Sequence, residues 1–116
     1  RDAYDTAEEI ARVSGAAKDG SAKREELSGS TITITSQGAL GGIATTPVIN
    51  HPEVAILGIG RIIDKPWVVN GELAVRKVTT ITIAFDHRVC DGGAAGGFIR
   101  FVADCIENPV GALTQI

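Results

Sequence analysis

The chain has 116 residues, of which 44% are hydrophobic, and a formal net charge of -3 at pH 7. This length predicts one modest domain, the charge argues against nucleic-acid binding, and no apolar run approaches the roughly 20 residues of a membrane span. Cys90 and Cys105 are too few for a disulfide framework and lack zinc-site spacings, which favours a reducing compartment and predicts no metal. The chain begins at Arg1 without a signal-peptide pattern, and we expect it to be part of a longer protein.

The N-terminal half predicts a helix, a connector, a strand and a long loop. Apolar residues share one helical face over residues 2–13, and the polar stretch 14–26 reads as a connector, with a short helical turn at 23–27. Residues 31–35 alternate and are all β-branched, which predicts a half-buried strand. The stretch 37–52 is rich in glycine and proline, so we expect a long loop with a functional or interfacial role.

The C-terminal half predicts three further strand regions and a helix. Residues 54–59 form an apolar run typical of a buried strand, and Asn70-Gly71 between two apolar runs predicts a hairpin. Residues 78–85 alternate as one further strand, and 93–107 have a helical pattern that Asn108-Pro109 ends. This order predicts an α/β fold of the α+β type, with helices packed on a mostly antiparallel or mixed sheet.

The most informative motif is the run FDHRVCDGG at residues 85–93. It places His87 at the end of a predicted strand and four residues before Asp91-Gly92, a pattern expected by chance in about one chain of this length in a hundred. A strand end holds a side chain rigidly beside an open loop, which suits a catalytic group. Two structural roles remain as alternatives, because His87 could cap the following helix and Asp91 is a preferred helix N-cap.

Three motifs, taken together in this order and spacing, resemble the dihydrolipoamide acyltransferases of the 2-oxo-acid dehydrogenase complexes: TITITSQGALGG at 31–42, PVINHPEVAILGIG at 47–60 and FDHRVCDG at 85–92. The resemblance covers essentially the whole chain and corresponds to the C-terminal half of that family's catalytic domain, without its lipoyl and peripheral-subunit-binding domains. It implies a two-layer fold like chloramphenicol acetyltransferase. It also implies homotrimers that build a cubic or icosahedral core, located in the bacterial cytoplasm or the mitochondrial matrix.

The resemblance further implies an acyl transfer between a dihydrolipoyl arm and coenzyme A, with a decarboxylase and a dihydrolipoamide dehydrogenase as partners of the core. His87 would be the base that deprotonates the attacking thiol, and Asp91 would orient His87 or the reacting groups. Thr35 would donate a hydrogen bond to the oxyanion, in a site shared with a neighbouring subunit. Many relatives have Asn where Ser36 stands, so Ser36 is an alternative donor.

Other interpretations stay open at this point. The chain could be a non-catalytic assembly fragment of such a core, or a stand-alone acetyltransferase of the chloramphenicol type. Cys90 could pair with His87 as a catalytic thiol, although a packed free thiol is favoured. Asp86 and Arg88 are expected to form an ion pair that holds the loop. His51 is expected to be structural or exposed, and Cys105 to lie in the core.

Overall fold

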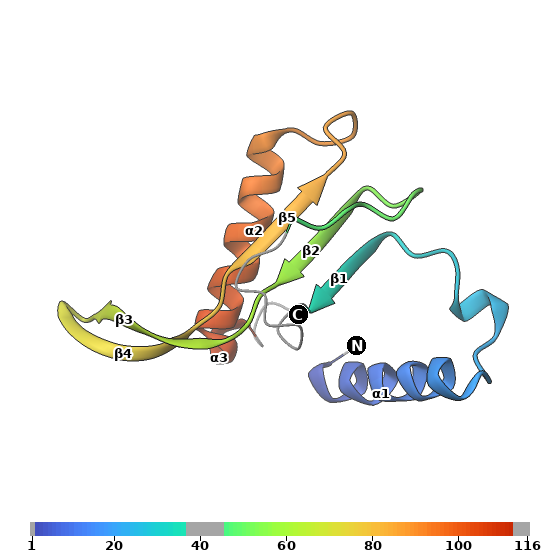
Figure 1. The fold of residues 1–116 in the computed structure, drawn as a ribbon, viewed down its shortest axis with the longest axis horizontal. Coiled ribbons are helices and arrows are strands. Elements are labelled where there is room, and N and C mark those ends of the chain that lie inside the picture. Colours follow the sequence, from blue (N-terminus) through green and yellow to red (C-terminus); the bar gives the residue numbers. More distant parts are fainter. Residues whose placement is uncertain (1, 37–45, 113–116) are drawn as a thin grey trace. The chain divides into compact units, whose positions relative to one another are not determined.

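The computed structural model describes residues 2–36 and 46–112, which Figure 1 draws as a coloured ribbon. The chain divides into two compact units, one formed by Arg1–Ser30 with Val102–Ile116 and the other by Thr31–Phe101. Of the long loop expected at 37–52, residues 37–45 lie outside the described part, and residues 46–50 have no regular secondary structure. No helix within the described residues is long and apolar enough to cross a membrane.

The first unit contains helix α1, Ala3–Asp19, whose ends are set by two caps. At its start, Asp2 Oδ1 accepts a hydrogen bond from the backbone N–H of Asp5 at 2.8 Å. At its end, Gly20 adopts the left-handed conformation with φ 79°. The sequence-based end at residue 13 is therefore wrong, because Gly15 continues the helix and the left-handed stop comes only at Gly20.

Arg12 connects α1 to the short 3-10 helix η1, Arg24–Glu26, which confirms the helical turn expected at 23–27. Its guanidinium bonds Glu9 at 2.6 Å and Glu26 at 2.8 Å, and these two carboxylates raise the pKa of Arg12 above its ordinary value. The remaining parts of this unit are the end of α2, Gly92–Glu107, and α3, Pro109–Ala112. Cys105 on α2 is only half-buried, so the expectation of a core cysteine is not met.

The second unit contains a three-stranded sheet in the order β1-β2-β5. Strand β1, Ile32–Ser36, is parallel to β2, Ala55–Ile59, and β5, Ile81–Phe85, is antiparallel to β2. A separate two-stranded sheet is formed by β3, Ile63–Val69, and β4, Glu72–Val78 (Figure 1). The mixed sheet expected from the sequence is thus confirmed.

The hairpin between β3 and β4 is confirmed at Asn70-Gly71, which have φ 53° and 81°, the positive pair of a type I′ turn. The single strand expected at 78–85 is wrong. The chain leaves β4 at Val78 and enters β5 at Ile81. In between, Thr79 Oγ1 donates to the Gly60 carbonyl at 2.9 Å, and Gly60 N–H donates to Thr80 at 3.0 Å. The chain therefore changes sheets twice here, between β2 and β3 at residues 60–62 and between β4 and β5 at residues 79–80. The alternating sequence pattern of 78–85 runs through the second change without a break.

The register gives the three-stranded sheet two chemically different faces. Aligned residues share a face, so one face carries Thr33–Ile56–Ala84 and Thr35–Gly58–Thr82, which are mostly small or polar. The rows of the other face are mostly apolar: Ile32–Ala55–Phe85, Ile34–Leu57–Ile83 and Ser36–Ile59–Ile81.

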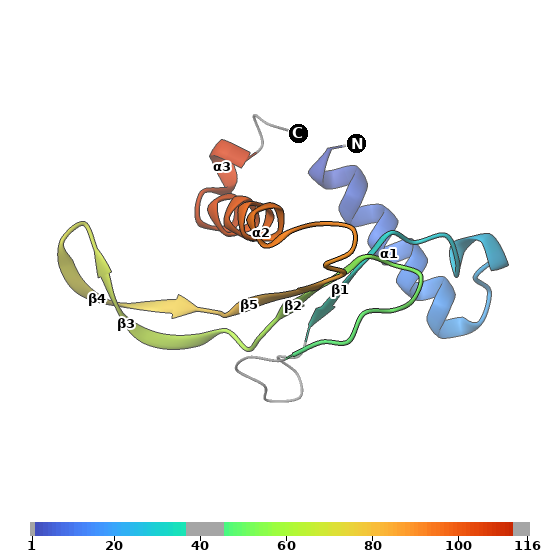
Figure 2. The ribbon, with the colours of Figure 1, turned by 90° about the horizontal axis from the view of Figure 1, so that it is seen from above.

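Burial centres on strand β2, where Ala55, Ile56 and Leu57 are buried, and on Ala95 of α2. Figure 2 shows the beginning of α2 on one side of the sheet. At the β1 edge, by contrast, the isoleucines are exposed, Ile34 by 65%, and the threonines Thr33 and Thr35 are half-buried.

The two glycine conformations predict opposite responses to alanine. Gly71→Ala should lower the free energy of unfolding by about 1 kcal/mol, because alanine is strained at φ 81°. Gly15→Ala is the matched control and should raise the free energy of unfolding by roughly 0.5–1 kcal/mol. The reason is that a Cβ there meets nothing within 4 Å among the described residues and alanine favours the helix. Urea unfolding measures both, and equal responses of the two variants would contradict the assignment.

Candidate functional site

The turn that carries His87 follows β5 and is held by its own residues. The Asp86 carboxylate accepts hydrogen bonds from the Arg88 guanidinium at 2.9 and 2.8 Å and from the Arg88 N–H at 3.0 Å. These bonds, with the Arg88 charge, lower the pKa of Asp86 to about 2, so Asp86 is charged at neutral pH. The expected ion pair between Asp86 and Arg88 is present. His87 between them is exposed, and the centroid of its ring lies 5.6 Å from the centroid of the Phe85 ring.

Main-chain bonds of Asp86 tie this turn to the sheet. Its N–H donates to the Val54 carbonyl at 2.8 Å, and its own carbonyl accepts from the N–H groups of Val89 at 2.9 Å and Cys90 at 3.1 Å. The Cys90 thiol also donates to this carbonyl at 3.8 Å. That contact favours the packed thiol over a catalytic Cys90–His87 pair.

Asp91 begins α2 as its N-cap residue. Its Oδ1 accepts from the Ala94 N–H at 2.7 Å, and its carbonyl accepts from the Ala95 N–H at 3.1 Å. The capping role that the sequence offered as an alternative is therefore present. A role of Asp91 toward His87 stays a prediction, and capping does not conflict with it because a carboxylate has two oxygens.

Thr35 and His87 lie at opposite ends of the three-stranded sheet. Thr35 is aligned with Gly58 and Thr82, whereas His87 follows Phe85 at the other end of β5. Five residues along a strand and two strand spacings separate them by roughly 20 Å. One chain therefore does not bring these two groups together. Ser36 is exposed and belongs to the other face from Thr35, which disfavours it as a substitute donor from the same position.

Sequence reasoning missed two polar groups near the face of the three-stranded sheet that carries Thr35. Glu53 is buried, with 9% of its surface exposed, and its Oε1 accepts a hydrogen bond from Thr33 Oγ1 on β1. Thr82 Oγ1 is buried and has no hydrogen-bond partner within the described residues. The alternation of residues 78–85 predicts that Thr82 shares a side with other polar residues. That Thr82 lies beside Gly58 of β2 is known only from the strand register.

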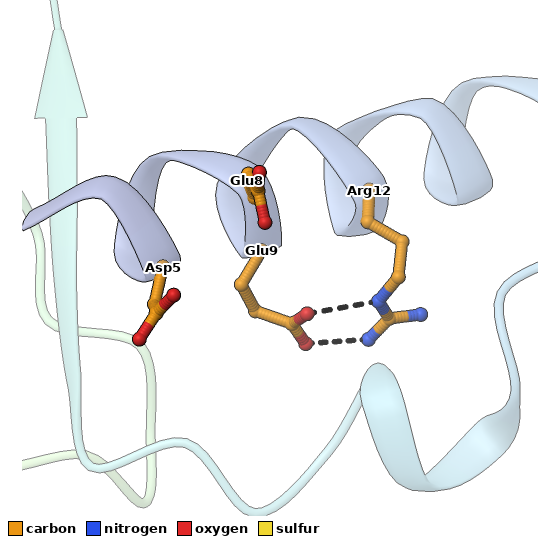
Figure 3. Close-up of a pocket in the computed structure, with 4 residues that line it drawn as sticks. All are labelled: Asp5, Glu8, Glu9 and Arg12. Carbon is orange, nitrogen blue, oxygen red and sulfur yellow. Dashed lines mark hydrogen bonds and ion pairs between the residues drawn. The ribbon is translucent and has the colours of Figure 1, made fainter. Parts of the chain in front are cut away.

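Two open hollows lie in the first unit and contain none of the predicted site residues. One, of about 530 Å³, is lined by Asp5, Glu8, Glu9 and Arg12, and Figure 3 shows the Glu9 and Arg12 side chains joined by two hydrogen bonds. The other, of about 480 Å³, lies along α1 and η1. Within residues 2–36 and 46–112, no group of three or more His, Cys, Asp and Glu side chains is placed to hold a metal ion. His51 is exposed.

Comparison with known proteins gives one consistent result. The family model "2-oxoacid dehydrogenases acyltransferase (catalytic domain)" matches residues 1–114. The lipoamide acyltransferase component of the branched-chain alpha-keto acid dehydrogenase complex of Pseudomonas aeruginosa is 54% identical over 109 residues, which are 94% of this chain and 26% of that protein. The dihydrolipoyllysine-residue acetyltransferase component of the pyruvate dehydrogenase complex of Staphylococcus epidermidis is 42% identical over 106 residues, which are 91% of this chain and 24% of that protein.

Solved structures agree with this result. A dihydrolipoamide acetyltransferase of Azotobacter vinelandii, studied for the role of a serine, a histidine and an asparagine in its catalytic mechanism, matches with a TM-score of 0.83 and 33% identity over 95% of this chain and 45% of its own. The cubic core of a pyruvate dehydrogenase multienzyme complex matches with a TM-score of 0.80 and 33% identity over 91% of this chain and 43% of its own. The expected α/β fold class is thereby confirmed. The chain spans about a quarter of the curated relatives and less than half of the solved chains.

Substitution of Asp91 separates helix capping from a role in turnover. Serine also caps helices, so Asp91→Ser should keep the melting temperature of the intact protein, whereas Asp91→Ala should lower its stability by about 1 kcal/mol. We expect Asp91→Ser to reduce turnover about tenfold, because the shorter hydroxyl does not replace the carboxylate toward His87. Asp91→Asn is the control for side-chain length, because asparagine also caps helices and keeps the length of aspartate and one acceptor oxygen. Full turnover in Asp91→Ser would assign Asp91 to capping alone.

Proposed function

Because the chain belongs to the acyltransferase family of the 2-oxoacid dehydrogenases, we propose that it forms part of the active site of a dihydrolipoamide acyltransferase. The reaction moves an acyl group between the thiol of a dihydrolipoyl arm and the thiol of coenzyme A, both of which are substrates. The chain spans only part of its relatives, so the active protein that we propose includes further residues.

The observation that carries the proposal is the spacing of three side chains. In the Azotobacter vinelandii enzyme, the serine precedes the histidine by 52 positions and the asparagine follows the histidine by four. Thr35 likewise precedes His87 by 52 positions, and Asp91 follows it by four. Threonine keeps the hydroxyl of serine, and aspartate keeps one acceptor oxygen of asparagine. The three residues chosen from the sequence therefore occupy the corresponding spacing with related chemistry.

These residues supply a complete proton and charge path for the transfer. A thiol has an ordinary pKa of about 8.5, so a base near neutrality is needed to form the attacking thiolate. Neutral His87 takes the thiol proton, and the thiolate sulfur bonds the thioester carbonyl carbon, whose oxygen becomes negative. The Thr35 hydroxyl donates a hydrogen bond to that oxygen. The intermediate then breaks its bond to the other sulfur, which leaves as a thiolate and takes the proton back from His87.

The distance between Thr35 and His87 supports a site that two copies of the chain complete. At roughly 20 Å within one chain, the base and the oxyanion donor are too far apart to act on one carbonyl. We therefore propose that His87 of one subunit faces Thr35 of another in a homotrimer that builds a larger core. A related pyruvate dehydrogenase protein forms a cubic core. A decarboxylase and a dihydrolipoamide dehydrogenase would be the further partners.

Exposed apolar side chains on the β3–β4 hairpin also support assembly. Val68 and Leu73 face each other across the two strands and are 67% and 77% exposed. On the opposite face of the hairpin, Trp67 is 52% exposed. Large apolar side chains exposed on both faces of one hairpin favour its being covered by other protein surface in the intact protein.

For the acyl group, we propose a branched-chain substrate. The basis is the difference in identity between the two classes of relatives: 54% for the branched-chain component and 42% for the pyruvate component. Both comparisons cover more than nine-tenths of the chain, so the difference does not arise from coverage.

Mixing two inactive variants tests the shared site. Assemblies of His87→Ala alone should lose about 10²–10⁴-fold in kcat, and assemblies of Thr35→Ala alone should lose about 10–10³-fold with little change in KM. Unfolding and reassembling the two variants at equal ratio should restore about a quarter of the wild-type activity, because one site in four then pairs an intact His87 with an intact Thr35.

Reassembly of each variant alone is the control for this experiment. Recovery no greater than in the controls would contradict a site shared between subunits. An assembled wild-type protein without any acyl transfer would instead favour the non-catalytic assembly role.

Acyl specificity is tested with acetyl-, succinyl- and isobutyryl-coenzyme A on the intact protein. We expect kcat/KM for the isobutyryl substrate to exceed that for the acetyl substrate by about tenfold or more, since added methyl groups contribute binding in a fitted apolar pocket. A preference for acetyl-coenzyme A would overturn the branched-chain assignment and leave the acyl transfer itself unaffected.

A further inference from the structure

The Thr82 hydroxyl is the unexplained polar group of the sheet. Thr33 donates to Glu53 and Thr79 donates to the Gly60 carbonyl, so both of these nearby threonines have partners. Thr82 Oγ1 is buried without a partner in the described part of the chain. Buried hydroxyls are almost always hydrogen-bonded to protein or to ordered water, which means that this one requires an explanation.

The register places Thr82 in the same row as Thr35, with Gly58 between them. Both threonines belong to the same face of the sheet, and their Cα atoms are about 10 Å apart across two strand spacings. In the neighbouring row Ile56 occupies the central position, whereas Gly58 places no side chain between the two hydroxyls. Two hydroxyls on either side of a missing side chain provide polar partners at both ends of the space over Gly58, and two linked waters span the distance between them.

We propose that Thr82 is a positioning residue for Thr35 and acts through two linked water molecules held over Gly58, an inference that rests on the proposed acyl transfer. The Thr82 hydroxyl donates to the first water, the first donates to the second, and the second donates to Thr35 Oγ1. The Thr35 hydrogen is then directed away from the row, toward the oxyanion. A hydroxyl whose oxygen accepts a hydrogen bond is also a stronger donor, so the chain strengthens the bond made in the transition state.

The test is Thr82→Val, which has nearly the same shape and lacks the hydroxyl, measured in the intact assembled protein. We expect kcat to fall about three- to tenfold with KM for coenzyme A and dihydrolipoamide unchanged, as for the loss of one hydrogen bond that matters in the transition state. Thr82→Ser keeps the hydroxyl and should keep most of kcat. The melting temperature of Thr82→Val should be unchanged or higher, because no bond between protein groups is lost.

Thr79→Val is the matched control. It removes a hydroxyl that does bond within the protein, at 2.9 Å from the Gly60 carbonyl, and lies outside the Thr35 row. This variant should lower the melting temperature and leave kcat unchanged, which is the opposite response to that of Thr82→Val. Gly58→Ala should lower kcat by filling the row, and the double variant with Thr82→Val should show no further loss, because both break the same chain of waters.

Wild-type kcat in Thr82→Val would overturn the proposal, as would a loss of kcat accompanied by a fall in melting temperature equal to that of Thr79→Val. A crystal structure that resolves waters and shows none between Thr35 and Thr82 would also overturn it. Failure of Thr35→Ala or His87→Ala to reduce kcat would instead refute the proposed function. Loss in those two variants without loss in Thr82→Val would refute only the role of Thr82.

Discussion

The pairing of β2 with strands on both sides is the constraint on which the rest of the second unit depends. β2 is parallel to β1 and antiparallel to β5, and its residues Ala55–Leu57 are buried. Side chains alternate between faces, so a shift of one residue in either pairing would exchange the polar and apolar faces of that neighbouring strand. The register therefore decides that Thr35 and Thr82 share a face. It also decides that His87 follows β5 at the far end of the sheet.

This arrangement divides the chemistry of the proposed reaction between the two ends of one sheet. One end supplies a hydroxyl for charge stabilisation, and the other supplies a base in a tightly bonded turn. In the proposed reaction each end is half of a site, and a second copy in the right orientation would join unlike halves. The exposed apolar side chains of the β3–β4 hairpin fit the proposed sharing of the site, because a chain that shares a site with a neighbour also needs surface with which to bind it.

Sequence reasoning succeeded where the signal is local. The Asn70-Gly71 turn, the α2 helix and the capping role of Asp91 all depend on residues within a few positions of one another. It failed where a local signal had two meanings or the interaction was distant. Gly15 and Gly20 look alike in the sequence, but only Gly20 ends α1. The unbroken alternation of 78–85 hides the change of sheet, and the Thr33–Glu53 bond joins residues 20 positions apart.

The Asp86 turn is largely self-contained, and this has a consequence for how such a site can diversify. Among the described residues, its carboxylate bonds Arg88 two positions later, its carbonyl bonds the N–H groups of Val89 and Cys90, and its N–H bonds the carbonyl of Val54, which precedes β2. The placement of the His87 turn then depends on few side chains outside its own segment. Substitutions elsewhere could then reshape an acyl pocket while the proposed base, His87, keeps its position, so related enzymes could acquire different acyl preferences around an unchanged turn.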